Sequence, residues 1–261
     1  LFIAVFRWGI GGAAVATGLG YSITAIVGLL VFSNRNSLLH FVRPVCRPQT
    51  LGRAVTNGCS EMATALVNGI ITLMFNWTML KYVGEDGVAA ITIISYVLAF
   101  AGSLYAGYAY GVAPMLSFYY GEQNHEKLRK LVRTSLKIIG VIAAATVLVS
   151  LAVTEPLVSI FARPGTPVYD LAVAGNRICS LALLFVGFNI FASGMFTALS
   201  NGLISAVLAF SRTFVFTLIA MLVLPVILGV TGIWLATPAA ELAAVVLSAV
   251  MLLKYRRRYC Y

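Results

Sequence analysis

Residues 134–153 read TSLKIIGVIAAATVLVSLAV, a run of twenty residues in which Lys137 is the one charged side chain. The hydrocarbon core of a bilayer is about 30 Å thick, and a helix of about 20 apolar residues crosses it. Backbone groups in hydrocarbon must be paired within their own segment, and strands of a membrane barrel would alternate apolar and polar residues, which this run does not. The run therefore predicts a transmembrane helix.

Six further apolar runs have the same character, so the chain is predicted to be an all-α, polytopic membrane protein with seven transmembrane helices. Its 261 residues are 61% hydrophobic and 10% charged, whereas a soluble globular chain carries about 45 to 50% apolar and about 25% charged residues. This composition excludes an ordinary soluble domain, a disordered chain and a fibrous repeat. The predicted helices cover 9–32, 55–80, 88–118, 134–153, 169–199, 205–228 and 232–253.

The basic residues are gathered in alternate connections: the one after the first span, the one after the third, and the C-terminal tail. Cytoplasmic loops of membrane proteins carry an excess of Lys and Arg, so we expect these connections and the C-terminus to be cytoplasmic. The expected location is the plasma membrane, which the chain crosses several times. The net charge of +10 would also suit a nucleic-acid-binding protein, but such a protein gathers its basic residues on one soluble face. Nucleic acid is therefore not expected as a partner.

Sequence patterns of enzymes and of metal sites are missing. The two histidines, His40 and His125, lie in different connections, and the chain has no HExxH, GxSxG or P-loop pattern. The four cysteines form no CxxC pair and have no histidine at zinc-site spacing, so neither a disulfide framework nor a metal site is indicated. We expect no enzymatic activity, no catalytic residues and no cofactor.

The second span has one polar face. Helical spacing places Thr64, Asn68, Thr72 and Asn76 within about 60° on either side of Glu61. Charged side chains inside spans are costly and usually face a bundle interior or a water-filled cavity, so this face is a candidate cavity wall that meets a cation or a cationic substrate. The alternative is structural: a Glu at the interface that the helix N-terminus favours, and Asn side chains that bond neighbouring helices.

Two other spans carry polar residues that could belong to the same cavity. In the third, Tyr105 lies near glycines and Pro114, which permit a bend of the kind that flanks transport sites; alternatively, the helix is structural and its tyrosines pack inside. In the fifth, Asn189 and Ser193 share one face. We predict a substrate and cation cavity, in which Glu61 is the charge partner of the cation. Its predicted lining residues are Glu61, Asn68, Asn76, Tyr105, Asn189 and Ser193.

Three further charged residues lie inside spans. Arg177 is either a structural tie to a carboxylate or carbonyl group, which we favour, or part of a pathway. Arg212 lies about two turns inside the sixth span near the predicted cytoplasmic side, where its long side chain can reach back to the interface. Glu241 follows Pro238 near the opposite side of the last span. It could be a proton or cation site, or it could bond a helix end.

A faint internal repeat divides the chain. Residues 12–17 read GAAVAT and residues 232–237 read GIWLAT, an offset of 232 − 12 = 220 residues. If each of two homologous halves ends with this element, the second half occupies about 34–261 and is preceded by only the last helix of the first half. The repeat therefore suggests that the chain begins in the middle of a longer protein.

Several short motifs follow one another in an order that resembles one known family. The stretch 12–17 is similar to the element that closes the first lobe of that family. Residues 57–62 (NGCSEM) and 84–90 (GEDGVAA) resemble the two ends of its seventh helix, and residues 107–114 (GYAYGVAP) with 120–124 (YGEQN) resemble its eighth-helix signature. The family is the multidrug and toxic compound extrusion (MATE) transporters, and the likeness is to its branch of staphylococcal multidrug exporters.

The resemblance implies an antiporter of two pseudo-symmetric six-helix lobes, which exports amphipathic, often cationic compounds in exchange for Na⁺ or H⁺. It implies that this chain is the C-terminal half: 1–33 would be the last helix of the N-terminal lobe, 34–54 the cytoplasmic linker between lobes, and 55–261 the six-helix C-terminal lobe. The implied partners are small drug-like or cationic compounds, the lipid bilayer and the missing N-terminal lobe.

The sequence departs from that family at two acidic positions. Relatives of the vibrio sodium-coupled type carry carboxylates in the seventh and tenth helices, but the matching positions here are near Asn68 and near Asn189 or Ile190. Coupling would then rest on Glu61 or on an acidic residue of the missing lobe. Two other functions stay open: a lipid-linked oligosaccharide flippase of the same superfamily, whose cavity would carry more cationic residues, and a non-transporting membrane fragment.

Overall fold

The computed structural model describes residue 6 and residues 8–33 and 48–259, with the backbone alone at residues 13, 24, 49–65, 257 and 258. All regular secondary structure in this part of the chain is helical. The chain falls into two compact units, Leu1–Gly58 and Cys59–Tyr261. The first unit holds α1 (Gly9–Ser33) and the beginning of α2 (Pro48–Tyr82).

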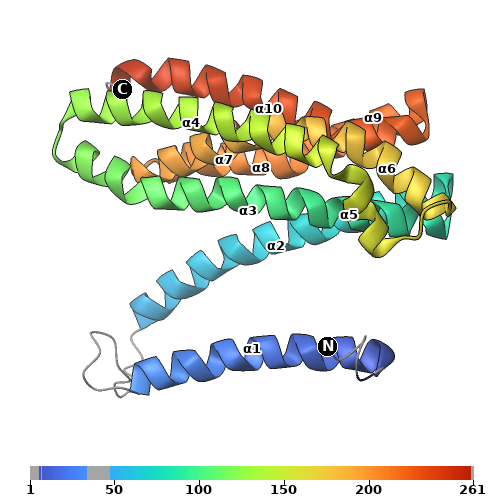
Figure 1. Cartoon of the computed structure of the whole chain (residues 1–261). Helices are drawn as coiled ribbons and strands as arrows, with labels where there is room; N and C mark the ends of the chain where they lie inside the picture. The colour runs from blue at the N-terminus through green and yellow to red at the C-terminus, as the bar shows by residue number, and fades with distance from the viewer. Residues whose placement is uncertain (1–5, 7, 34–47, 260–261) are drawn as a thin grey trace. The chain divides into compact units, whose positions relative to one another are not determined.

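The second unit holds the rest of α2 and a series of helices connected by short turns (Figure 1). In chain order these are α3 (Glu85–Gly121), α4 (His125–Ala152), α5 (Thr154–Phe161), α6 (Pro167–Cys179), the 3₁₀ turn η1 (Ser180–Ala182), α7 (Leu183–Ala198), α8 (Gly202–Phe210), the π-helical turn η2 (Ser211–Phe216), α9 (Thr217–Leu228) and α10 (Val230–Tyr259).

Six helical segments among the described residues are long and apolar enough to cross a membrane. They coincide with six of the seven predicted spans, and the predicted all-α membrane fold is confirmed. The seventh predicted span, 55–80, lies inside the 35-residue α2, which begins at Pro48, within the predicted linker 34–54. Residues 34–47 lie outside the described part of the chain, and the division into lobes stays a prediction. The six segments are Gly9–Ser33, Glu85–Gly121, His125–Ala152, Pro167–Ala198, Gly202–Leu228 and Val230–Arg256.

Two of these segments are not continuous α-helices. The helix predicted at 169–199 consists of α6 and α7, joined by η1, where Ser180 Oγ donates to Asn176 O at 2.6 Å. A serine that bonds the carbonyl one turn back competes with the helical ladder and bends the helix. The segment predicted at 205–228 contains the six-residue turn η2 between α8 and α9.

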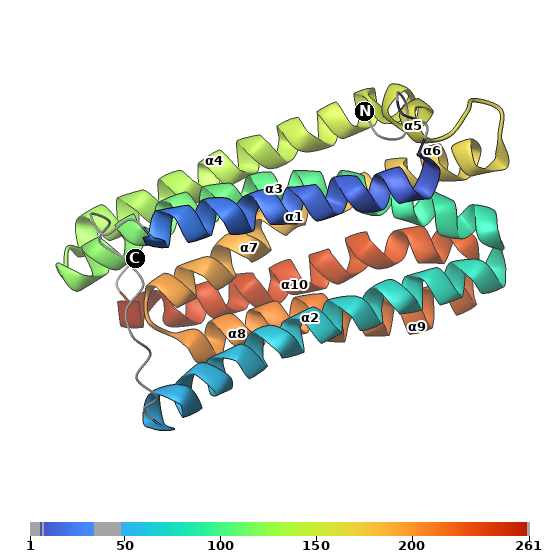
Figure 2. The same ribbon diagram turned by 90° about the horizontal axis from the view of Figure 1, so that it is seen from below.

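Helix α7 packs against α3, α4, α8 and α10, and Figure 2 shows it between α3 and α10. Its close approach to α3 depends on Gly187, because a Cβ at this position would lie 2.6 Å from Cδ1 of Tyr105. Small residues at helix contacts let backbones come close in membrane proteins. Side chains of α7 are thereby held near those of α3 and α10.

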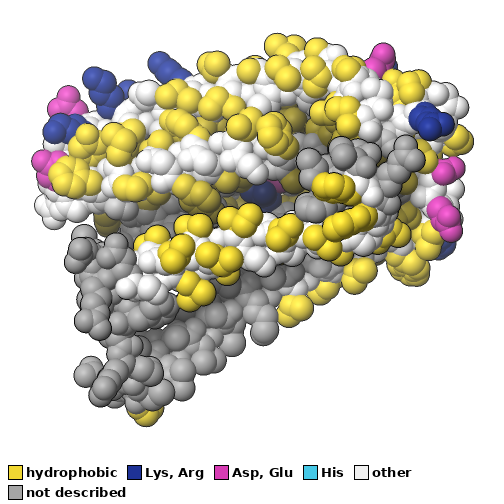
Figure 3. Space-filling model, turned by 60° about the horizontal axis from the view of Figure 1, so that its bottom comes forward, with side chains coloured by type: hydrophobic (Ala, Val, Ile, Leu, Met, Phe, Trp, Pro, Cys, Tyr) yellow, Lys and Arg dark blue, Asp and Glu magenta, His cyan; other side chains and the backbone are white. Residues whose placement is uncertain are grey.

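The surface of the second unit has the polarity of a membrane protein. On the face visible in Figure 3, most Lys, Arg, Asp and Glu side chains lie at the two ends of the helices, and hydrophobic side chains are spread along the length between. Large hydrophobic residues such as Leu203, Val226 and Ile227 are more than two-thirds exposed. Such a surface is stable against lipid tails and would aggregate in water.

Candidate functional site

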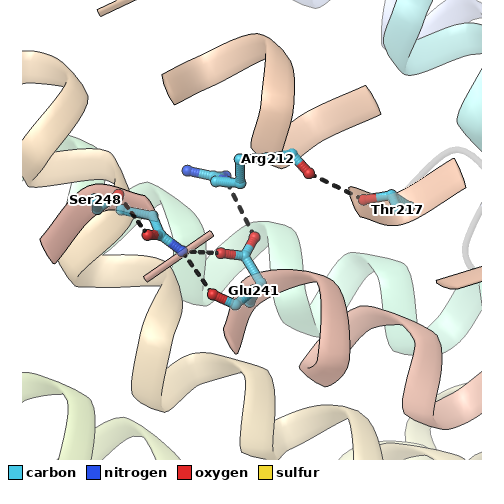
Figure 4. A network of polar contacts seen from close by, with 5 residues as sticks. Arg212, Thr217, Glu241 and Ser248 are labelled. Atoms are coloured by element: carbon cyan, nitrogen blue, oxygen red, sulfur yellow. Dashed lines mark hydrogen bonds and ion pairs between the residues drawn. The ribbon is translucent and has the colours of Figure 1, made fainter. Parts of the chain in front are cut away.

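The π-helical turn η2 carries Arg212 and lies between α8 and α9. Thr217 Oγ1 donates to the Arg212 carbonyl oxygen at 3.1 Å, across five residues, so this side chain satisfies a carbonyl within the widened turn (Figure 4). Short π-helical turns inside α-helices interrupt the regular ladder and are frequent at functional sites. Here the turn presents Arg212 to α10.

Glu241 lies on α10, three residues after Pro238. Proline has no N–H, so the carbonyl four residues earlier, that of Trp234, lacks its helical donor. Cys179 on α6 supplies one, because its Sγ lies 3.3 Å from Trp234 O. This side-chain contact lets α10 pass through Pro238 and continue to Glu241.

Four side chains from three elements are joined by hydrogen bonds and an ion pair, and we call them the Glu241 network: Asn189, Arg212, Glu241 and Ser248. Arg212 Nε pairs with Glu241 Oε1 at 3.0 Å, and Asn189 Nδ2 donates to Glu241 Oε2 at 2.7 Å. Asn189 Nδ2 also donates to the Glu241 carbonyl at 3.0 Å, and Ser248 Oγ donates to Asn189 Oδ1 at 2.9 Å. Figure 4 shows the resulting chain of contacts from η2 to the later part of α10.

The Glu241 network is shielded from the surroundings. As whole residues, Asn189, Ser248 and Glu241 are at most 9% exposed. The side chains of Arg212 and Glu241 are 26% and 12% exposed. A charge in the apolar part of a membrane costs free energy unless it is paired and hydrogen-bonded. Both carboxylate oxygens of Glu241 have a donor, so the sequence provides a compensated charge pair inside the bundle.

The positions of Arg212 and Glu241 correct two expectations from the sequence. Arg212 does not extend to the membrane interface, because its guanidinium binds a carboxylate on α10. Glu241 does not bond a helix end, and it does not lie on the opposite side of the bundle from Arg212. The sequence presents the two residues separately, and their pairing is the part of the candidate site that it did not predict.

Asn189 and Ser193, both predicted to line the cavity, lie on α7 but bind different partners. Asn189 is part of the Glu241 network. Ser193 Oγ lies 3.0 Å from Ser205 Oγ on α8, and Thr197 Oγ1 donates to the same Ser205 oxygen at 2.7 Å. The polar side chains of α7 therefore form hydrogen bonds with two neighbouring helices, α10 and α8.

Tyr105 is buried, at 2% exposure. Its hydroxyl donates to Leu183 O at 2.9 Å and lies 2.5 Å from Thr146 Oγ1. A single phenol thus ties α3 to α4 and to the start of α7. This placement agrees with the alternative of a tyrosine packed inside the bundle.

The predicted residues of α2 lie elsewhere. Asn76 lines an open groove of about 780 Å³, and none of Asn68, Tyr105, Asn189 and Ser193 does. Asn68 is exposed. Glu61 lies within the helix, but its side chain falls outside the described residues. No hydrogen bond among the described atoms joins two of the six predicted residues, and their common cavity stays a prediction. The groove is also lined by Leu73, Trp77, Leu80, Glu85, Val88, Ala89, Thr92, Ile93, Tyr96, Phe161 and Val168.

Arg177 forms an ion pair with Glu155, with 2.8 Å between Nη2 and Oε1. The two side chains are 57% and 61% exposed and connect α6 to α5. The favoured interpretation of Arg177 as a structural tie to a carboxylate is confirmed. No group of three or more His, Cys, Asp and Glu side chains within the described part of the chain could hold a metal ion.

A multi-pass helical bundle whose broken spans surround a compensated buried charge has features typical of membrane transport proteins. A protein-family model described as MatE matches residues 62–223, more than half of the chain. The chain belongs to the MATE family, and the resemblance seen in the sequence motifs is confirmed.

Individual relatives agree with this family. The multidrug export protein MepA of Staphylococcus haemolyticus (strain JCSC1435) is 22% identical over 249 residues, which are 95% of this chain and 54% of that protein. A solved inward-facing conformation of a multidrug resistance MATE family transporter superposes with a TM-score of 0.83, at 22% identity, over 99% of this chain and 60% of that chain. The chain spans little more than half the length of these proteins.

The same fold occurs in a transporter of the wider MOP superfamily from Pyrococcus furiosus Vc1 (DSM3638). This structure has a TM-score of 0.78 and 21% identity, over 99% of this chain and 58% of that chain. At these identities the solved structures show the fold of this chain.

Proposed function

We propose that the complete protein containing this chain is a multidrug exporter, which moves amphipathic, often cationic compounds across the bacterial inner membrane in exchange for Na⁺ or H⁺. Membership of the MATE family and the likeness to a multidrug export protein support this function. The distribution of basic residues supports a cytoplasmic C-terminus. The proposed binding partners are the exported compounds, the bilayer and an N-terminal lobe.

The observation that carries the proposal is the Glu241 carboxylate, held inside the bundle by Arg212 at 3.0 Å and Asn189 at 2.7 Å. A carboxylate can exchange a guanidinium partner for a proton or for a metal cation, because each of them neutralises its charge. The exchange would free Arg212, which already reaches the surface of the unit. We propose that this exchange couples ion movement to a rearrangement of η2 against α10.

The residues predicted from the sequence take different parts in this proposal. Glu61, Asn68 and Asn76 share one stripe of α2 and are proposed to contact the exported compound. Asn189 is proposed to act on the ion through Glu241. Tyr105 and Ser193 have their hydroxyl groups engaged with other helices, and we propose that they keep α7 in position.

The test is transport by Glu241→Gln in the complete protein, with Glu155→Gln as the matched control. Both substitutions remove one carboxylate from an Arg–Glu pair, one buried and one exposed. We expect efflux of a cationic dye from vesicles to fall about tenfold or more in E241Q, the effect of losing a charge-assisted contact of about 1.5 to 3 kcal/mol. E155Q should transport like the unmodified protein.

A second variant separates charge from folding. Glu241→Asp keeps the carboxylate, so partial efflux in E241D together with none in E241Q would assign the loss to the charge. Equal efflux rates and an equal response to imposed Na⁺ and pH gradients in E241Q and E155Q would remove Glu241 from the mechanism. Glu61→Gln in the same assay tests the proposed cation contact on α2.

The flippase alternative is not favoured by the contacts of Arg177 and Arg212, the two arginines inside predicted spans that were considered for a pyrophosphate. Arg177 is paired with Glu155 and Arg212 with Glu241. An arginine whose charge is already compensated by a carboxylate offers little attraction to a second anion. Export of cationic compounds fits the buried carboxylate better.

A further inference from the structure

A small pocket lies at one end of the second unit, between the first turns of α4 and the last turns of α10. Its volume is about 260 Å³. Figure 1 shows that α4 starts at the end of the bundle where α10 reaches the C-terminus. Three arginines and four aliphatic residues line this pocket: Arg129, Arg133, Arg256, Val132, Leu136, Leu252 and Leu253.

The lining residues are ordered along the helix axes. On α4, Leu136 lies one turn deeper in the span than Arg133, by about 4.5 Å at 1.5 Å per residue. On α10, which runs in the opposite direction, Leu252 and Leu253 come before Arg256 and are again the deeper residues. The pocket is therefore cationic at the end of the bundle and apolar toward its middle.

The arginines of α4 form a cationic edge that lacks a partner within the described chain. Arg129 and Arg133 are four residues apart, so they lie on one face of the helix, where like charges repel. Both are exposed, and neither forms an ion pair with an acidic side chain of the described residues, Glu126 included. An anion between them would relieve this repulsion, and the guanidinium fork suits phosphate oxygens.

The apolar wall of the pocket is preformed. Val132 is 4% exposed and belongs to a buried cluster that includes Leu128 and Phe191, and Leu136 and Leu252 pack against this cluster. Leu253, which also lines the pocket, is 68% exposed. A ligand with a hydrocarbon part would cover this leucine as well as bind the arginines.

We propose that the pocket binds an anionic phospholipid, with its headgroup phosphate at Arg129, Arg133 and Arg256 and the first part of an acyl chain along Leu136 and Leu253. The two kinds of lining residue indicate this ligand. A free phosphate would contact the arginines alone, and a neutral lipid would contact the leucines alone. Basic pockets between membrane helices select acidic headgroups in this way. The pocket is separate from the Glu241 network, and its occupation does not depend on the transport function proposed above.

The test is lipid binding by the full chain in neutral phosphatidylcholine nanodiscs, titrated with phosphatidylglycerol and followed by native mass spectrometry. Arg129→Gln and Arg133→Gln should each weaken phosphatidylglycerol binding about fivefold, and the double variant about 25-fold, the size expected for one basic residue near an anionic headgroup. Lys130→Gln is the matched control, because it removes the same charge from an exposed neighbour on α4 that does not line the pocket. K130Q should bind within twofold of the unmodified chain.

Two further measurements distinguish the source of the phosphate. Leu253→Asn should weaken phosphatidylglycerol binding while leaving the arginines in place, and inorganic phosphate at millimolar concentration should not displace the lipid. Full displacement by inorganic phosphate would overturn the proposal in favour of a free-phosphate site. An equal loss in K130Q and R133Q, or equal binding of phosphatidylglycerol and phosphatidylcholine, would overturn it in favour of general surface attraction. Circular dichroism verifies that each variant keeps its helices.

Discussion

Two Arg–Glu pairs join helices of the second unit, and they differ in their surroundings. Arg177 and Glu155 are 2.8 Å apart with side chains 57% and 61% exposed, whereas Arg212 and Glu241 are 3.0 Å apart and 26% and 12% exposed. The ionic groups and distances are nearly the same. What differs is how much of each charge would be left without compensation if its partner were removed.

The surroundings of each pair explain the contrast. Glu155 lies in the first turn of α5, where the helix dipole favours a negative charge even without Arg177. Glu241 lies inside α10, away from any helix end, and its charge is compensated by Arg212 and by one hydrogen bond from Asn189 to Oε2. Removing one partner of the exposed pair leaves a charge that water can solvate. Removing one partner of the buried pair leaves a charge without compensation inside the bundle.

The largest effect is expected for Arg212→Met, which leaves the Glu241 charge buried and uncompensated. Breaking one side of a buried ion pair costs about 3 to 5 kcal/mol, and we expect the free energy of unfolding in mixed micelles to fall by that order. Arg177→Met, the same change at the exposed pair, is the control. A loss no larger in R212M than in R177M would show that Glu241 finds other compensation.

Asn189→Ala should have the next largest effect. It removes the donor to Glu241 Oε2 and the acceptor of Ser248 Oγ, and each buried polar group left unpaired costs about 1 to 3 kcal/mol. The unfolding measurement should show a loss smaller than that of R212M and larger than that of Ser248→Ala, which removes one hydrogen bond. A larger loss of unfolding free energy in S248A than in N189A would contradict the central place of Asn189 in the network.

The fold could be predicted from the sequence because membrane helices depend on local composition. Each span is a run of apolar residues, and in hydrocarbon such a run has no stable alternative to a helix. Interruptions inside the spans were not predictable in the same way. The π-helical turn at Ser211–Phe216, with the sequence SRTFVF, differs from the α-helices beside it in its hydrogen bonds, and that difference does not depend on one residue type.

The Glu241 network could be predicted only in part. Asn189 was a candidate because it shares a polar face of its span with Ser193, but its partner Glu241 is 52 residues away on another helix. Counting residues from the turn between the last two spans could have predicted that Arg212 and Glu241 lie at similar depths. From the turn at Gly229, Arg212 is 229 − 212 = 17 residues back and Glu241 is 241 − 229 = 12 residues forward, so the two depths differ by about 7 to 8 Å, within reach of two long side chains.

The double variant Arg212→Met, Glu241→Met removes both buried charges together. Comparing it with R212M separates the effect of the unpaired charge from the effect of losing the arginine side chain. Apolar residues in place of a whole buried ion pair are often neutral or stabilising. We expect the double variant to regain most of the stability lost in R212M and to remain inactive in dye efflux. A double variant as unstable as R212M would mean that the arginine stem and not the charge supports η2.

The smallest effect is expected for Glu155→Gln, at the exposed pair. Exposed ion pairs contribute about 0 to 1 kcal/mol, and salt screens them. The free energy of unfolding of E155Q should therefore lie within about 1 kcal/mol of the unmodified chain, and the difference should shrink further in 1 M salt, where the screening length is about 3 Å. The Arg212→Met loss should keep most of its size at that salt concentration, because salt screens a buried pair much less than an exposed one. If the two losses responded to salt alike, the difference in exposure between the pairs would not be the reason for their difference in strength.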